Sequence, residues 1–196
     1  MKRYDLSQEV FSCRVYPGDP APQFERVNST AKGDLYNLTA FAMCAHNGTH
    51  ADAPFHFLHH GKTIDELGLE PFVGMACVIE HQGEVTAEAA GEILRTAKQA
   101  GAAERLLIKG NAVVSTEAAN VFAQAGILLL GVESQSVGPE EAPMAAHLAL
   151  LGAGAALLEG LRMSDVPEGV YLLSAAPLKL GGADGAPCRA VLIDLN

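Results

Sequence analysis

The residues best suited to chemistry in this chain lie close together, between residues 44 and 60. Five of its seven histidines fall in this segment, together with one aspartate. His46, His50, Asp52 and His56 follow one another at intervals of four, two and four residues. Imidazole and carboxylate groups are the ligands of hydrolytic divalent-metal sites. The segment therefore predicts a metal site.

A glycine and a proline shape this histidine-rich segment. Gly48 loosens the backbone and Pro54 cannot donate a backbone hydrogen bond, so one continuous helix is disfavoured. We expect an ordered, mostly extended loop, which can turn three or four side chains toward one point. The neighbouring His59 and His60 are expected to lie in an exposed turn.

The composition indicates an acidic, globular protein. At 196 residues the chain is long enough for one domain, residues 1–196, with a sizeable core. Hydrophobic residues make up 49% and charged residues 18% of the chain. The formal net charge is −10, from 23 acidic and 13 basic residues. Because phosphate binding needs clustered lysine and arginine, we expect neither a nucleic-acid partner nor an anionic membrane surface.

We expect a cytoplasmic protein with reduced thiols. Residues 1–10 have a basic start but no apolar stretch behind it, unlike a signal peptide. The most apolar stretches, residues 126–132 and 147–158, are too short or too broken by glycine to span a bilayer. The cysteines are scattered and form no C-x-x-C pair: Cys13, Cys44, Cys77 and Cys188. For Cys44, which lies beside the histidines, core packing is favoured over a contact with the site.

Strands and helices alternate in the predicted secondary structure from residue 75 onward, whereas the first third is richer in strand and loop. Apolar runs and alternation predict strands over 4–10, 36–43, 75–80, 105–109, 126–132, 155–159, 169–174 and 189–195. Helical spacing of apolar residues, with serine, threonine or proline at the start, predicts helices over 86–100, 115–124 and 143–151. The fold class is therefore mixed α/β.

Two distant residues are candidates for the same site. His147 lies on the last predicted helix, and Glu159 closes an apolar run twelve residues later. A carboxylate at the end of a buried strand is costly unless it is paired or bound to a cation. The alternative for Glu159 is a strand end that faces solvent. The histidine-rich segment could close one metal site alone, or share Asp52 between two ions.

The sequence from His46 to His56, H-N-G-T-H-A-D-A-P-F-H, resembles the H-x-G-T-H-x-D-x-P-x-H signature of the cyclase family of metal-dependent hydrolases. That family includes bacterial kynurenine formamidases and isatin hydrolases. Residues 16–19, Y-P-G-D, resemble the proline-glycine-aspartate loop of the family, and His147 with Glu159 matches the spacing of its distal ligand pair. The resemblance extends from about residue 4 to residue 195.

The resemblance implies a two-metal hydrolase with a swivelling β/β/α fold, commonly assembled as a dimer or tetramer. His46, His50 and Asp52 would bind one divalent ion, zinc or manganese. Asp52 and Glu159 would bridge toward a second ion, with His147 as its ligand and His56 outside as the acid/base residue. The implied reaction is hydrolysis of a small-molecule amide by a metal-activated water.

Two residues depart from the family pattern. Tyr16, the expected substrate-binding residue, stands where kynurenine formamidases commonly carry tryptophan, and this chain has no tryptophan. Glu133 stands where aspartate is frequent, and we interpret it as a structural carboxylate near the site. Three hypotheses follow: an arylformamidase that acts on N-formylkynurenine, a hydrolase of a cyclic amide, imide or lactone, and a non-catalytic metal-binding protein.

Overall fold

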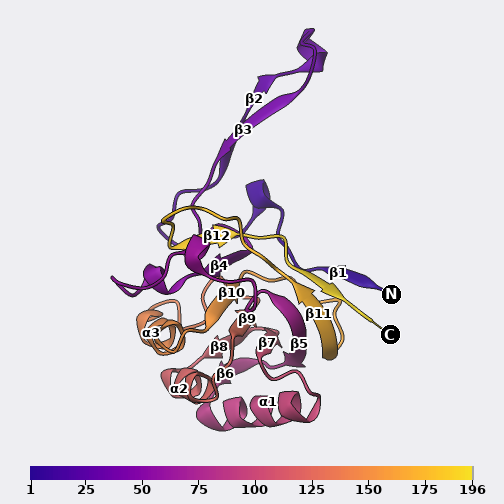
Figure 1. The fold of residues 1–196 in the computed structure, drawn as a ribbon. Coiled ribbons are helices and arrows are strands. Elements are labelled where there is room, and N and C mark those ends of the chain that lie inside the picture. The colour runs from indigo at the N-terminus through magenta and orange to yellow at the C-terminus, as the bar shows by residue number, and fades with distance from the viewer. Residues whose placement is uncertain (196) are drawn as a thin grey trace.

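The computed structural model describes residues 1–195, which fold around a curled, nine-stranded mixed sheet (Figure 1). Its strand order is β1 (Arg3–Asp5), β13 (Val191–Ile193), β11 (Gly169–Ser174), β5 (Val73–Glu80), β7 (Arg105–Lys109), β9 (Leu129–Val132), β10 (Ala156–Glu159), β4 (His50–Asp52) and β12 (Gly185–Pro187). The four central strands, β5, β7, β9 and β10, are parallel. The strands on both flanks pair antiparallel.

Three helices connect the parallel strands and cover one face of the sheet (Figure 1). They are α1 (Ala87–Gln99), α2 (Thr116–Gln124) and α3 (Met144–Gly152). The side chains of Thr86 and Ser115 accept hydrogen bonds from backbone N–H groups in the first turns of α1 and α2. Along β7, Leu106 and Ile108 pack under the helices, whereas Leu107 packs in the core on the opposite face. The sheet is therefore buried on both sides.

A long hairpin projects from the body of the protein (Figure 1). It consists of β2 (Gln23–Asn28) and β3 (Leu38–Ala42), which pair antiparallel, and we call residues 23–42 the β2–β3 arm. Most of its side chains are exposed. A second small sheet pairs β6 (Gly83–Val85) with β8 (Ala112–Val114) in parallel, beside the first helices.

The mixed α/β class is confirmed, and the helices and central strands follow the predicted ranges closely. The strand expected over 4–10 is shorter, because β1 ends at Asp5 and a 3₁₀ turn begins at Val10. β2 lies partly in a segment that we expected to be loop, and β6, β8 and β12 were also missed. The last three have only three residues each and depend on partners far away in the sequence. No described helix is long and apolar enough to cross a membrane.

The histidine-rich segment differs from the expected loop in one important respect. His50–Asp52 form a true strand, β4, which lies between β10 and β12 and pairs with both. Pro54–His56 then form a 3₁₀ turn. A three-residue strand is stable here because both of its edges are hydrogen-bonded. Since side chains alternate along a strand, this correction places His50 and Asp52 on the same face of the sheet.

At Gly160, immediately after β10, the chain packs closely against the backbone that precedes β4. Its φ is +69°, and an added Cβ would collide with the carbonyl oxygen of Gly48. Gly154 has a similar φ of +86° but no atom within 4 Å of such a Cβ. We expect Gly154→Ala to lower the free energy of unfolding by about 1 kcal/mol, the cost of the left-handed backbone. Gly160→Ala should cost about 1–3 kcal/mol more, because it adds the collision.

Urea denaturation of the two variants measures this difference. Equal losses of stability would mean that the backbone of Gly48 does not pack against Gly160 in solution.

Candidate metal centre

Three of the predicted ligands extend from neighbouring strands at the carboxyl end of β10. In the antiparallel pairing of β10 with β4, Glu159 lies directly opposite His50. Asp52 is two residues further along β4, so all three side chains extend from one face of the sheet. Ala51 and Leu158 point to the opposite face, into the core. His50, Asp52 and Glu159 are 1%, 0% and 2% exposed, so the cluster is buried.

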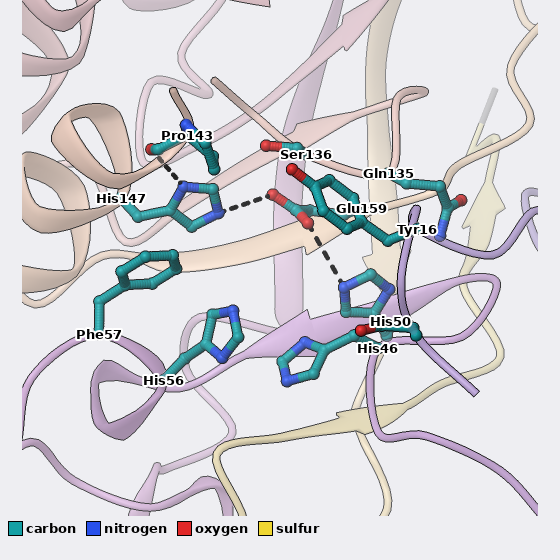
Figure 2. Close-up of a pocket in the computed structure, with 11 residues that line it drawn as sticks. Tyr16, His46, His50, His56, Phe57, Gln135, Ser136, Pro143, His147 and Glu159 are labelled. Atoms are coloured by element: carbon teal, nitrogen blue, oxygen red, sulfur yellow. Dashed lines mark hydrogen bonds and ion pairs between the residues drawn. The ribbon is translucent and has the colours of Figure 1, made fainter. Parts of the chain in front are cut away.

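The fourth side chain, His147, reaches the cluster from α3, which covers β10 (Figure 2). Its Nε2 atom lies 3.2 Å from Glu159 Oε1 and 3.5 Å from Asp52 Oδ2. The Nε2 atom of His50 approaches the same two carboxylates from the other side, at 3.4 Å from each. The structure thus brings β4 together with α3 and β10, whose residues His147 and Glu159 follow His50 by 97 and 109 residues in the sequence.

Backbone carbonyl groups orient both imidazole rings. His50 Nδ1 lies 3.0 Å from the carbonyl oxygen of Gly48, and His147 Nδ1 lies 2.8 Å from that of Pro143. A carbonyl oxygen can only accept a hydrogen bond, so Nδ1 carries a proton in both rings. The Nε2 atoms are therefore the ones available to a metal ion, and the rings are held in place before any ion binds.

His46 and His56 form a second group beside the first. His46 Nδ1 lies 2.9 Å from Asp52 Oδ1, and its Nε2 atom lies 2.8 Å from Asp184 Oδ2. His56, from the 3₁₀ turn, places Nδ1 3.0 Å from the same oxygen of Asp184. The two rings lie close together, with centroids 4.0 Å apart. Asp184 was not identified from the sequence.

The buried carboxylates dominate the electrostatics of the site. Burial alone would lower the pKa of His50 and His147, but hydrogen bonds and charge from Asp52 and Glu159 raise both values to about 10. Burial alone would raise the pKa of Asp52, yet hydrogen bonds from the surrounding histidines hold it well below its usual value. Without an ion, the carboxylates therefore keep protons on the histidines. A cation can replace those protons.

The donor set fits divalent metal ions. Asp52 Oδ2 is fully buried and has no hydrogen-bond partner among residues 1–195. Two groups of potential ligand atoms share Asp52, and within each group the atoms lie within 4.8 Å of one another. One group is His50, Asp52 and Glu159, and the other is His46, Asp52 and His56. This grouping differs from the expected one, in which His46 and His50 bind the same ion and His56 binds none.

A cavity of about 250 Å³ opens beside the cluster. The four site histidines and Glu159 line one side of it (Figure 2). The rest of the lining consists of Tyr16, Asp19, Phe57, Gln135, Ser136 and Pro143. The hydroxyl of Tyr16 donates a hydrogen bond to the carbonyl oxygen of Glu140 at 2.8 Å, which holds the ring at the cavity wall. The predicted substrate-binding residue therefore borders the space that a substrate could enter.

Sequence reasoning missed Gln135, Ser136 and Asp184. Ser136 is buried and its hydroxyl has no hydrogen-bond partner among the described residues, although it lines the cavity. Gln135 donates a hydrogen bond to the carbonyl oxygen of Gly48, just before β4. These are common residue types in loops, and no local pattern distinguishes them. Only their position after β9 or before β12 brings them to the site.

The remaining expectations have mixed outcomes. Both carboxylate oxygens of Glu133 accept backbone hydrogen bonds, from Gly110 and Met163, which agrees with a structural role. Cys44 is only half-buried and belongs to neither core cluster, contrary to expectation. Its thiol lies 3.7 Å from a carboxylate oxygen of Asp19, another cavity residue. His59 and His60 are exposed, as predicted.

Comparisons with known proteins identify relatives along nearly the full chain. The chain is 35% identical to the kynurenine formamidase of Salinibacter ruber, covering 99% of this chain and 98% of the relative. It is 32% identical to the kynurenine formamidase of Erythrobacter litoralis, covering 98% and 94%. Among solved structures, a predicted metal-dependent hydrolase from Bacillus stearothermophilus matches with a TM-score of 0.81 and 28% identity, covering 97% of each chain.

The fold is shared with more distant proteins as well. Isatin hydrolase A from Labrenzia aggregata superimposes with a TM-score of 0.82 at 23% identity, covering 97% of this chain and 93% of that one. The Cyclase family model matches residues 4–139, which include the histidine-rich segment. Together with the full-length relatives, this match shows that the chain belongs to the cyclase family.

Proposed function

We propose that this protein is a metal-dependent arylformamidase that hydrolyses N-formylkynurenine to kynurenine and formate. One observation carries the proposal: a buried cluster of histidines and carboxylates forms one wall of an open cavity. The kynurenine formamidases that match the full length of the chain support the choice of substrate.

We propose that the histidines and carboxylates clustered around Asp52 hold two divalent ions, zinc or manganese. Imidazole and carboxylate donors suit both metals. The proposed ligands are His46, His50, Asp52, His147 and Glu159. When bound, such ions supply a Lewis acid for the substrate carbonyl and a water molecule of lowered pKa.

The side chains of the protein complete the proposed reaction. As water adds its oxygen to the formyl carbon, the C–N bond breaks and the leaving nitrogen needs a proton. His56 borders the cavity and is the residue that we assign to deliver this proton and later recover one from water. Tyr16 and Phe57 present aromatic rings to the cavity, where they can pack against an aromatic substrate.

A second candidate function is hydrolysis of a cyclic amide, imide or lactone. The observation that favours it is Tyr16, which replaces the tryptophan expected in a kynurenine formamidase and whose hydroxyl already binds a backbone carbonyl. A non-catalytic metal site is less consistent with the geometry. Structural zinc sites are closed and rich in cysteine, whereas this cluster borders a cavity and contains no cysteine.

We further propose a cytoplasmic, single-domain protein that assembles into a dimer or tetramer. All four cysteines are free thiols, as expected in a reducing compartment. The β2–β3 arm supports association, because it carries large apolar side chains that are 44–97% exposed: Phe24, Val27, Leu35, Tyr36, Leu38 and Phe41. Apolar exposure on this scale is typical of a surface that a partner covers.

The substrate proposal is tested with a panel of compounds. Protein loaded with Zn²⁺ or Mn²⁺ should hydrolyse N-formylkynurenine faster than isatin, cyclic imides or lactones, as measured by absorbance or chromatography. Protein treated with a chelator is the control and should be inactive. Hydrolysis of a cyclic compound without activity on N-formylkynurenine would favour the second candidate function. Absence of activity on every compound of the panel would reject both candidate functions.

The roles of two histidines can be separated by measuring metal content and activity together. His50→Ala should lose metal and activity, because its Nε2 atom faces both buried carboxylates. His56→Ala should retain metal but lose about two or more orders of magnitude in kcat. His59→Ala, an exposed histidine three residues away, is the control and should match wild type. Loss of metal from His56→Ala would make His56 a ligand, and a fully metallated, active His50→Ala would remove the proposed centre.

The assembly proposal is tested at the base of the arm. Phe24 and Phe41 are directly paired across β2 and β3, and each is more than half exposed. Replacing both with glutamate should convert the oligomer to a monomer in light-scattering measurements, because it places charge in the proposed interface. Ala40→Glu, on the opposite face of the arm, is the matched control. A monomeric wild-type protein would contradict the proposal.

A further inference from the structure

Asp184 reaches the site from the opposite end of the chain. It immediately precedes β12, whose first residue, Gly185, pairs with Asp52 on β4. This pairing brings the carboxylate of Asp184 to His46 and His56, which come from a segment about 130 residues earlier. Asp184 is not among the residues that line the cavity. It therefore contacts the two rings from outside the space proposed for substrate.

A single oxygen of Asp184 serves both histidines. Oδ2 lies 2.8 Å from His46 Nε2 and 3.0 Å from His56 Nδ1. A carboxylate oxygen accepts, so the Nδ1 atom of His56 is the donor and carries a proton. The Nε2 atom, on the other side of the ring, is then left to accept or donate a proton in the cavity. The contact with Asp184 thus selects both the orientation and the tautomer of His56.

Backbone hydrogen bonds hold the segment that carries this carboxylate. The carbonyl oxygen of Asp184 accepts a hydrogen bond from the N–H of Ala53 at 2.9 Å, and that of Ala183 accepts one from Ile64 at 2.9 Å. The N–H of Gly182 donates to the carboxylate of Asp65. A carboxylate on a fixed backbone can orient its partners, whereas one on a free loop would follow them.

The next residue leaves room for the His46 ring. A Cβ at position 185 would lie 2.7 Å from His46 Cε1 and 2.8 Å from the carbonyl oxygen of Ala51. Both distances are shorter than any relaxed contact, so only glycine permits the observed position of the ring. Asp184 and Gly185 therefore act on His46 together, since one binds the ring and the other gives it space.

We propose that Asp184 is a positioning residue, which fixes the His56 tautomer and aligns His46 for metal binding. The inference rests on the proposed function, because that function assigns the roles of the two histidines. Carboxylates that bind the far nitrogen of a metal-ligating histidine fix its ring and raise its basicity, and their loss weakens metal binding. Here one carboxylate does this for a ligand and for the proposed proton carrier at once.

The test compares Asp184→Asn and Asp184→Ala with Asp165→Asn, which changes an exposed carboxylate in the connection between β10 and β11. Zn²⁺ affinity is measured by competition with a chromophoric chelator, and kcat and KM are measured on N-formylkynurenine. Asp184→Ala should weaken Zn²⁺ binding and lower kcat by about tenfold to a hundredfold, with KM nearly unchanged. Asp184→Asn, which keeps an acceptor oxygen without the charge, should fall between Asp184→Ala and wild type.

A second variant acts on the same ring through the neighbouring residue. Gly185→Ala keeps the carboxylate but adds a Cβ that would collide with His46 Cε1 and with the carbonyl oxygen of Ala51, so it should also weaken Zn²⁺ binding. If Asp184→Ala does not fold, Asp184→Asn, whose side chain has nearly the same size, keeps the proposal testable. Wild-type Zn²⁺ affinity and kcat in both Asp184 variants would overturn the positioning role while leaving the proposed function intact. A wild-type protein that binds no Zn²⁺ would instead overturn the proposed function, and the inference with it.

Discussion

The structure depends on keeping two carboxylates, Asp52 and Glu159, buried side by side in the core. They are 0% and 2% exposed, and neither can remain ionised there without nearby positive charge. In the absence of an ion, His50 and His147 supply that charge, and their raised pKa values reflect it. A divalent cation satisfies the same requirement more completely, because it can bind the carboxylates and the Nε2 atoms together. The cost of the buried charge is thus the physical basis of the site's affinity for metal.

The surrounding elements are arranged around this requirement. β4 is held between two strands, which fixes its register so that His50 faces Glu159. α3 packs over β10 and brings His147 to the same carboxylates. Gly160 allows the backbone of Gly48 to approach closely. A shift of one residue in the β4 register would turn the side chains of His50 and Asp52 into the opposite core, so the cluster depends on this pairing.

The cluster is closed on the core side and open on the other, and this asymmetry favours catalysis over a structural role. His50, His147 and Glu159 are almost fully buried, whereas His46 and His56 are partly accessible. The accessible pair also contacts Asp184. Burial alone would raise the pKa of the Asp184 carboxyl group, but its hydrogen bonds with His46 and His56 lower it. In the proposed reaction, most of the ligands are therefore the buried residues, and the more accessible His56 transfers the proton.

Local sequence was sufficient for the helices, the central strands and the histidine-rich segment, whereas the full proposed ligand set followed from the family resemblance. Apolar periodicity and capping residues identify elements whose own burial stabilises them, and the spacing of His46, His50, Asp52 and His56 is visible in the sequence itself. The short strands β4 and β12 could not be predicted, because three residues are stable as a strand only through partners distant in the sequence. For the same reason Asp184, Gln135 and Ser136 remained unrecognised. The tertiary structure alone decided which side chains share the site, since strand pairing, and not sequence proximity, brings them together.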